Sequence, residues 1–169
     1  MIEMKVMGIA LDTRSGSPIV VLNDEQNKIA LPIWIGSAEA SSIIRKIENI
    51  KSQRPMTHDL FINLIEKTGY KLLRIEINEV SEQTYYSNLV MENSDGKTIE
   101  IDARPSDAIA IAIRGDVPIF VSESVMTDGA ISTSSERDEK EAMEFKEFIK
   151  DIKPSDFEKL INKNFESDQ

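Results

Sequence analysis

Apolar residues alternate with polar ones in several short segments, and groups of these segments are followed by segments with helical spacing. Period-two alternation is typical of half-buried strands, and apolar residues three and four positions apart are typical of an amphipathic helix. The expected strands cover residues 4–12, 18–22, 29–35, 71–77, 85–91, 98–103 and 118–121. The expected helices cover residues 37–49, 57–67 and 105–114. The sequence therefore predicts an α+β fold with a mixed, largely antiparallel sheet packed by helices.

The order of three strands and a helix occurs twice along the chain. A shift of 68 positions aligns two sets of residues: Leu31, Ile33 and Ile35 with Ile99, Ile101 and Ala103. The same shift places the helix beginning Ser37–Ala40 on Pro105–Ala108. The pattern is compatible with an internal duplication of a βββα unit.

Local signals set several of the expected element boundaries. Ser37 is suited to the N-cap of the first helix, and Gly69 and Gly115 are expected to end the second and third helices. Asn93–Gly96 is a strong hairpin signal between two expected strands. The strands and helices should therefore be short and well separated.

The C-terminal part of the chain differs in composition from the rest. Residues 127–138 are rich in Ser, Thr, Gly and Asp and predict a linker. Helical spacing then predicts a charged helix over 140–152 and a short helix from residue 154. We expect one domain over residues 1–135 and an acidic helical extension over 136–169, which holds eleven acids and seven bases. This extension is expected to dock or to bind a partner rather than nucleic acid.

Charge and residue content exclude several function classes. Thirty acidic residues against twenty Lys and Arg give a net charge of −10, so any nucleic-acid role must rest on a local cationic patch. The chain has no cysteine and one histidine, His58, which excludes disulfides, thiolate chemistry and a His-rich zinc site. No apolar run approaches the length of a membrane span, so we expect a cytoplasmic protein without membrane contact. Phosphate-binding Gly-rich loops and the Gly-x-Ser-x-Gly elbow are also absent, which disfavours nucleotide-dependent enzymes and esterases.

Uncommon polar residues gather at three expected helix beginnings: Ser37–Glu39, Arg54–Asp59 and Asp102–Asp107. Capping and the helix dipole explain many of them, since Ser, Thr, Pro and acids all favour the first turn. They do not explain an Arg directly before Pro, which occurs at Arg54 and at Arg104. Two such guanidinium groups could clamp a phosphate, or they could form ion pairs with neighbouring acids.

Two side chains and one set of acids complete the candidate site. His58 is the only imidazole available for proton transfer near neutral pH, although a histidine in a first helical turn is often a surface residue. Trp34 could stack on a base or pack against the following helix or a partner subunit. Carboxylates that could converge on a magnesium ion belong to Glu39, Asp59, Asp102 and Asp107.

These helix beginnings and two flanking segments form four motifs. The motifs are Leu31–Gly36 with Glu39, Arg54–Leu60, Ile101–Ala110 and Pro118–Val121. In their order and spacing, over roughly residues 4–125, they resemble the bifunctional nuclease domain family. The resemblance implies a small bacterial or plant protein that degrades both DNA and RNA, with an α+β fold and a homo-oligomeric state.

The resemblance also implies the site residues. The expected catalytic residues are Arg54, His58, Asp59, Asp102, Arg104 and Asp107. The expected substrate-binding residues are Arg54, Thr57, Arg104 and Ser106, and the expected metal ligands are Glu39, Asp59, Asp102 and Asp107. The acids would place Mg²⁺ or another divalent cation or polarise water, the arginines would stabilise charge on the phosphoryl oxygens, and His58 would act as general acid or base.

Two hypotheses about function follow. The first is a phosphodiesterase that acts on DNA and RNA, with single-stranded or small substrates. The second is a non-catalytic oligomeric scaffold or small-anion-binding regulatory protein, in which the same charged residues form an ion-pair network that holds the three helix beginnings together.

Overall fold

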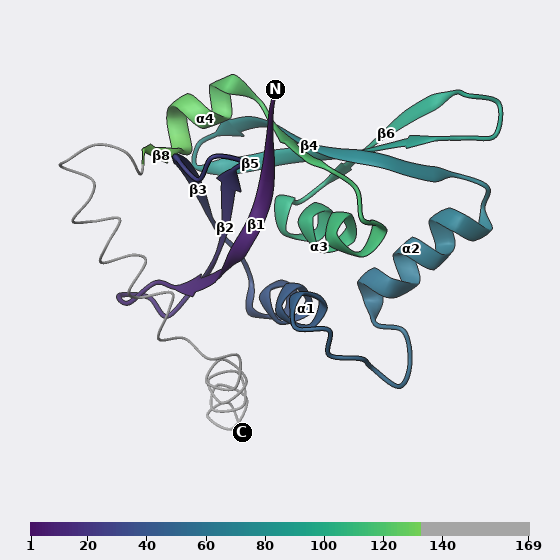
Figure 1. Cartoon of the computed structure of the whole chain (residues 1–169), viewed down its shortest axis with the longest axis horizontal. Coiled ribbons are helices and arrows are strands. Elements are labelled where there is room, and N and C mark those ends of the chain that lie inside the picture. Colours follow the sequence, from purple (N-terminus) through teal and green to yellow (C-terminus); the bar gives the residue numbers. More distant parts are fainter. Residues whose placement is uncertain (133–169) are drawn as a thin grey trace.

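The computed structural model describes residues 1–132, which form eight strands and four helices (Figure 1). The strands are β1 (Ile2–Leu11), β2 (Pro18–Asp24), β3 (Ile29–Trp34), β4 (Lys71–Ser81), β5 (Thr84–Glu92), β6 (Thr98–Ala103), β7 (Ile119–Val121) and β8 (Ile131–Ser132). The helices are α1 (Ser37–Ile47), α2 (Thr57–Lys67), α3 (Pro105–Gly115) and α4 (Glu123–Gly129). Every strand and helix predicted within these residues is present, and α4 and β8 are additional.

All eight strands belong to one sheet, with the order β6-β5-β4-β7-β1-β2-β3-β8. Each neighbouring pair is antiparallel except β4 and β7, which are parallel. The short strand β7 lies at the centre, where Ile119 and Val121 are buried, and it joins two meanders, β1–β3 and β4–β6. The predicted α+β fold with a mixed, largely antiparallel sheet is confirmed.

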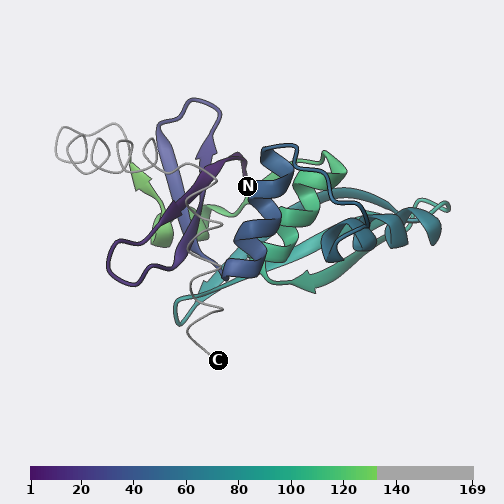
Figure 2. The same ribbon diagram turned by 90° about the horizontal axis from the view of Figure 1, so that it is seen from below.

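The predicted repeat of three strands and a helix is present as topology. Each meander is followed by a helix, and α1 and α3 both begin and end 68 positions apart. Helix α2 follows only the first unit, and it contacts α3. Figure 2 shows α1 and α3 side by side, with α2 next to them. The three helices therefore form a layer whose middle member is α3.

Burial follows from the apolar content of α3. The run Ala108–Ala112 is buried throughout, because α3 contacts α1, α2, β4 and β5. Ile75, Ile77 and Leu89 face this helix layer from the sheet as part of the same core cluster. Burying one such side chain stabilises the fold by about 1.5–3 kcal/mol, so the position of α3 is set by packing.

Three local predictions need correction. Gly36, not Ser37, is the extended N-cap residue of α1. Glycine suits this position because the Glu39 side chain occupies the space that a Cβ would need. Helix α3 extends to Gly115 as expected, but the left-handed C-cap residue that stops it is Asp116 (φ 52°), and Gly115 is the last helical residue. The first part of the expected linker, Thr127–Gly129, belongs to α4, whose N-cap Ser122 accepts the Val125 N–H.

Several predictions concern the C-terminal part of the sequence. Ile131 and Ser132, which the sequence also assigns to the linker, form β8 and pair with β3. Residues 133–138 of the linker, the helices from residue 140 onward, the domain boundary at residue 135 and the extension 136–169 lie outside the described residues. Of the described helices, none is long and apolar enough to cross a membrane.

Candidate active site

The beginnings of α1, α2 and α3 are connected by a continuous set of polar contacts, here called the Arg104 cluster: Glu39, Ser42, His58, Arg104 and Asp107. The N-cap residue of α3, Arg104, donates Nε to Asp107 Oδ2 at 2.8 Å and a terminal N–H to Glu39 Oε1 at 2.7 Å. The other Asp107 oxygen lies 3.0 Å from His58 Nε2, and His58 Nδ1 lies 2.7 Å from Ser42 Oγ. Residues far apart in the sequence are thus brought together.

A second group of polar contacts, centred on Arg114, lies next to the Arg104 cluster. Arg114, in the last turn of α3, donates Nε to Asp59 Oδ1 at 2.6 Å and its terminal N–H groups to the carbonyls of Ala110 and Ser42 at 2.9 and 3.1 Å. The Arg114 side chain is only 6% exposed, whereas that of Asp59 is 39% exposed. Ser42 joins both groups, through its hydroxyl to His58 and through its carbonyl to Arg114.

The acids of both groups occupy equivalent helical positions. Glu39, Asp59 and Asp107 are each the third residue of their helix. Free N–H groups and the helix dipole favour a carboxylate there, and Asp59 accepts the Met56 N–H at 2.9 Å. Local helix chemistry therefore places the carboxylates, and the two arginines then connect one helix to another.

These contacts change the ionisation of the acids. Burial raises the pKa of Asp107, but hydrogen bonds from Arg104 and His58 outweigh it and bring the pKa below its ordinary value. Burial likewise raises the pKa of Asp59, and the Met56 N–H and Arg114 lower it by more. The hydrogen bonds to Asp107 and Glu39 raise the pKa of Arg104. Both aspartates are therefore ionised at neutral pH.

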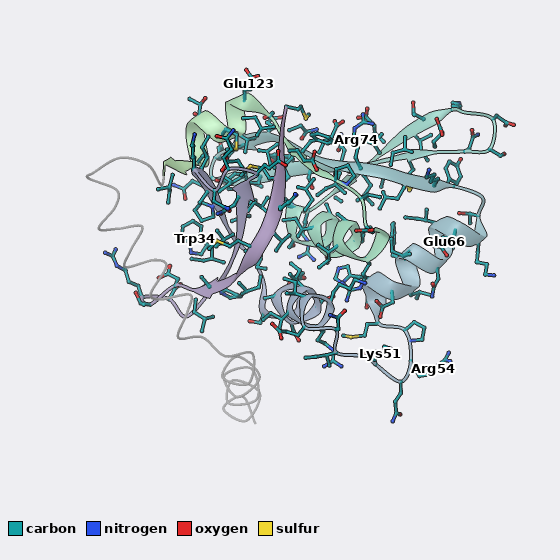
Figure 3. The ribbon with its side chains drawn as sticks, viewed as in Figure 1. Trp34, Lys51, Arg54, Glu66, Arg74 and Glu123 are labelled. Atoms are coloured by element: carbon teal, nitrogen blue, oxygen red, sulfur yellow. The ribbon has the colours of Figure 1, made fainter. Side chains whose placement is uncertain are left out.

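An open groove of about 390 Å³ runs beside the Arg104 cluster. Arg104, Ser106, Trp34 and Tyr85 are among its lining residues. The Arg104 side chain is 67% exposed. Trp34 is 56% exposed and donates Nε1–H to Asp12 Oδ2 at 3.1 Å, so a large part of its indole is open to solvent (Figure 3). A guanidinium group and an exposed indole along one groove can contact a phosphate and a base.

Comparison with known proteins assigns the family. The sequence model of the bifunctional nuclease domain matches residues 20–134. The chain belongs to the bifunctional nuclease domain family. An uncharacterized protein of Mycobacterium tuberculosis is 35% identical over 163 residues, which cover 92% of this chain and 97% of that protein. The predicted family is confirmed.

Plant relatives in the family carry the name of an activity. Bifunctional nuclease 2 of Oryza sativa subsp. japonica is 32% identical over 124 residues, which cover 71% of this chain and 38% of the plant protein. Bifunctional nuclease 1 of Oryza sativa subsp. indica is 29% identical over 116 residues, which cover 68% of this chain and 35% of the plant protein. The chain thus corresponds to somewhat over a third of each plant nuclease.

Some predicted site residues of the bifunctional nuclease domain do not join the cluster. Arg54 is exposed on the outer edge of the loop between α1 and α2, and its side chain makes no hydrogen bond or ion pair within residues 1–132 (Figure 3). Asp102 on β6 is exposed and Thr57 at the start of α2 is exposed, and no contact connects either side chain with the cluster. Ser106 is buried and lines the groove.

The four predicted metal ligands do not fit a ready-made magnesium site. Within residues 1–132, no three acidic or histidine side chains are grouped so that they could hold a metal ion. Glu39 and Asp107 accept hydrogen bonds from Arg104, and Asp59 accepts one from Arg114. Magnesium prefers several free oxygen ligands in octahedral geometry, but three of the four predicted carboxylates already accept hydrogen bonds from arginine, and the fourth, Asp102, is not connected with them.

Two residues of the site were not predicted from the sequence. Ser42 lies 3% exposed on the inner face of α1, where its hydroxyl is the only polar group beside buried Ala40 and Ile43. Arg114 follows the apolar run of α3 and resembles an ordinary C-terminal basic residue. The only signal in the sequence was that Ser42, a polar residue, lies within the apolar stripe of a helix. That position does not indicate which side chain the hydroxyl contacts.

Proposed function

We propose that this member of the bifunctional nuclease domain family is a phosphodiesterase that cleaves DNA and RNA. The observation that supports this most is the position of Arg104, a mostly exposed guanidinium held by two carboxylates at the edge of an open groove that also exposes Trp34. A nucleotide strand in this groove would place a phosphate on Arg104 and a base on Trp34. The family name and the plant nucleases support the reaction class.

The proton chemistry assigned to His58 follows from its two contacts. Ionised Asp107 only accepts hydrogen bonds, so His58 Nε2 carries the hydrogen toward it. In the neutral ring, Nδ1 is then an acceptor for the Ser42 hydroxyl. Asp107 and Ser42 are positioning residues that hold the ring and its tautomer. His58 does not itself line the groove, so a role as general base would require the Ser42 hydroxyl to turn away and leave Nδ1 free to accept a proton from the attacking water.

The other predicted residues keep supporting roles in this proposal. Glu39 and Asp107 hold Arg104, Asp59 holds Arg114, and Ser106 lies in the groove wall. Arg54, Thr57 and Asp102 are exposed and would act only on a substrate that extends beyond the groove. Dependence on magnesium and a cytoplasmic location stay predictions.

The homo-oligomeric state also stays a prediction. Leu60 and Leu64, four residues apart on α2, are 60% and 54% exposed, and such a pair suits the contact between two copies of the chain. Light scattering of the wild type and of Leu60→Lys measures the change in mass that this contact requires.

Hydrolysis of end-labelled single-stranded DNA and RNA by the full-length protein tests the proposed activity. We expect Arg104→Met and His58→Gln to reduce kcat by at least about 100-fold, which is the typical contribution of a charge-stabilising or proton-transfer group. Magnesium and EDTA arms measure the metal dependence separately.

Arg74→Met is the matched control. Arg74 donates Nε to Glu76 at 2.6 Å on β4, so this variant also breaks one Arg–carboxylate pair, but neither residue lines the groove. We expect it to cleave like the wild type. Wild-type rates in folded Arg104→Met would contradict the assignment of the groove.

One observation favours a second candidate function, a small-anion-binding or scaffold protein without catalysis. Every charged group of the Arg104 cluster has an oppositely charged or hydrogen-bonding partner, as in a network that only connects helices. A wild-type protein that binds oligonucleotides without cleaving them, with and without divalent cations, would support this candidate instead.

A further inference from the structure

A pocket of about 320 Å³ lies where α1 ends and the chain turns toward α2. Four basic side chains line it, from Arg45, Lys46, Lys51 and Arg114. Among the described residues that line the pocket, Asp59 is the only acid. The pocket is therefore strongly cationic, and we name it the basic pocket.

This concentration of positive charge contrasts with the rest of the chain. Residues 1–135 carry nineteen acids and thirteen bases, so four bases and one acid around one small volume depart from the local average. The dipole of α1 favours Arg45 and Lys46 in its last turn. It does not account for Lys51 in the loop or for Arg114 on α3, which come from other parts of the structure.

Arg114 is a preorganised donor in the wall of the basic pocket. It is held by Asp59 and by the carbonyls of Ala110 and Ser42, with only 6% of its side chain exposed. Each terminal nitrogen makes one of these bonds, so each retains a second N–H that no described residue accepts. A fixed guanidinium with unused N–H groups binds an anion at a low entropic cost.

The loop that carries Lys51 is also ordered by local bonds. Asn49 adopts a left-handed conformation (φ 54°), and the N–H of Ile50 donates to the Arg45 carbonyl at 2.8 Å. The Arg45 side chain donates to Ser52 Oγ at 3.2 Å. The loop is therefore folded back over the end of α1, which brings Lys51 to the same pocket as Lys46.

We propose that the basic pocket binds the dianionic phosphate of a small phosphomonoester, such as a mononucleotide. A phosphomonoester carries close to two negative charges near neutral pH, whereas a phosphodiester carries one, so a pocket with a clear excess of cations favours the monoester. Ile50 and Met56 supply an apolar wall against which a nucleoside can rest. The basic pocket shares no lining residue with the groove beside Arg104, so phosphate binding here can be measured apart from the proposed hydrolysis, although Asp59 and Arg114 also connect the helices of the candidate active site.

Isothermal titration calorimetry of the full chain at low ionic strength tests this inference. The probes are inorganic phosphate, adenosine 5′-monophosphate, adenosine and dimethyl phosphate. We expect saturable binding of the first two and none of the last two at the same concentrations. Tighter binding of the mononucleotide than of phosphate is expected from the Ile50 wall.

The double variant Lys46→Gln/Lys51→Gln removes two exposed charges of the basic pocket without touching a buried group. We expect it to weaken phosphate and mononucleotide binding by about tenfold or more. The matched control Lys71→Gln/Lys97→Gln removes two exposed lysines elsewhere and is expected to bind like the wild type.

Three results would overturn the inference. These are no saturable binding of phosphate by the wild type, equal binding by the Lys46→Gln/Lys51→Gln variant, and equal affinity for dimethyl phosphate and phosphate. Arg104→Met separates the two proposals, because it should lower the rate of hydrolysis as stated above while leaving mononucleotide binding in the basic pocket unchanged.

Discussion

The two arginines that connect the helices differ greatly in exposure, and this difference predicts how much each stabilises the fold. Arg114 is 6% exposed and Arg104 is 67% exposed, although each bonds to a carboxylate at 2.6–2.8 Å. We expect Arg114→Met to lower the free energy of unfolding by much more than Arg104→Met. The substitution keeps most of the apolar length of the side chain and removes only the guanidinium.

The magnitudes follow from the contacts. Arg114→Met loses one charge-assisted bond to Asp59, about 1.5–3 kcal/mol, and two bonds to carbonyls, about 0.5–1.5 kcal/mol each. Asp59 is 39% exposed and can be rehydrated, and Met packs well, so the net loss should be about 2–3 kcal/mol. Arg104→Met breaks solvent-screened pairs and should cost at most about 1 kcal/mol.

Urea unfolding followed by far-UV circular dichroism measures both variants, with Arg74→Met as the control for a single Arg–Glu pair at intermediate exposure. The expected difference between Arg114→Met and Arg104→Met is about 2 kcal/mol at equal m values. Equal losses for the two variants would refute the argument from exposure. A large loss in Arg104→Met would show that the Arg104 cluster mainly holds the helices together, as the scaffold hypothesis requires.

Three further predictions concern the acids, Ser42 and Trp34. The folded-state pKa values of Asp59 and Asp107 are lowered, so their contribution to stability is present above the ordinary aspartate value of 3.8 and is lost as pH falls through the folded values. Asp107→Asn should therefore reduce the loss of unfolding free energy at acidic pH, as measured by urea unfolding at a series of pH values. An unchanged loss at acidic pH would contradict this prediction. Ser42→Ala should lower the free energy of unfolding by about 1–3 kcal/mol, because His58 Nδ1 loses its hydrogen-bonding partner, and it should also lower kcat in the hydrolysis assay; a variant as stable and as active as the wild type would exclude the positioning role. Trp34→Ala should weaken binding of single-stranded oligonucleotides by roughly 5- to 100-fold, as measured by fluorescence anisotropy of a labelled strand, and undiminished affinity would remove Trp34 from the groove's function.

Most of the fold could be predicted from the sequence because its signals are local. Alternation and helical spacing located all seven predicted strands and the three helices within residues 1–132, and Gly69 and Gly96 have the positive φ angles expected of a helix end and a hairpin turn. The shift of 68 positions anticipated that α1 and α3 begin at equivalent places. The acids at the third position of each helix were also visible, since helix starts have strong residue preferences.

The tertiary structure alone decided which charged side chains contact one another. Arg54-Pro55 and Arg104-Pro105 look alike in the sequence, yet Arg104 bonds to two acids and Arg54 extends from the outer edge of a loop. The physical reason is that α3 is buried between the sheet and two helices, so its first turn faces other charged groups, while the loop before α2 faces solvent. Sequence thus determined where each helix begins and which charges it carries there, and packing around α3 determined which of those charges meet.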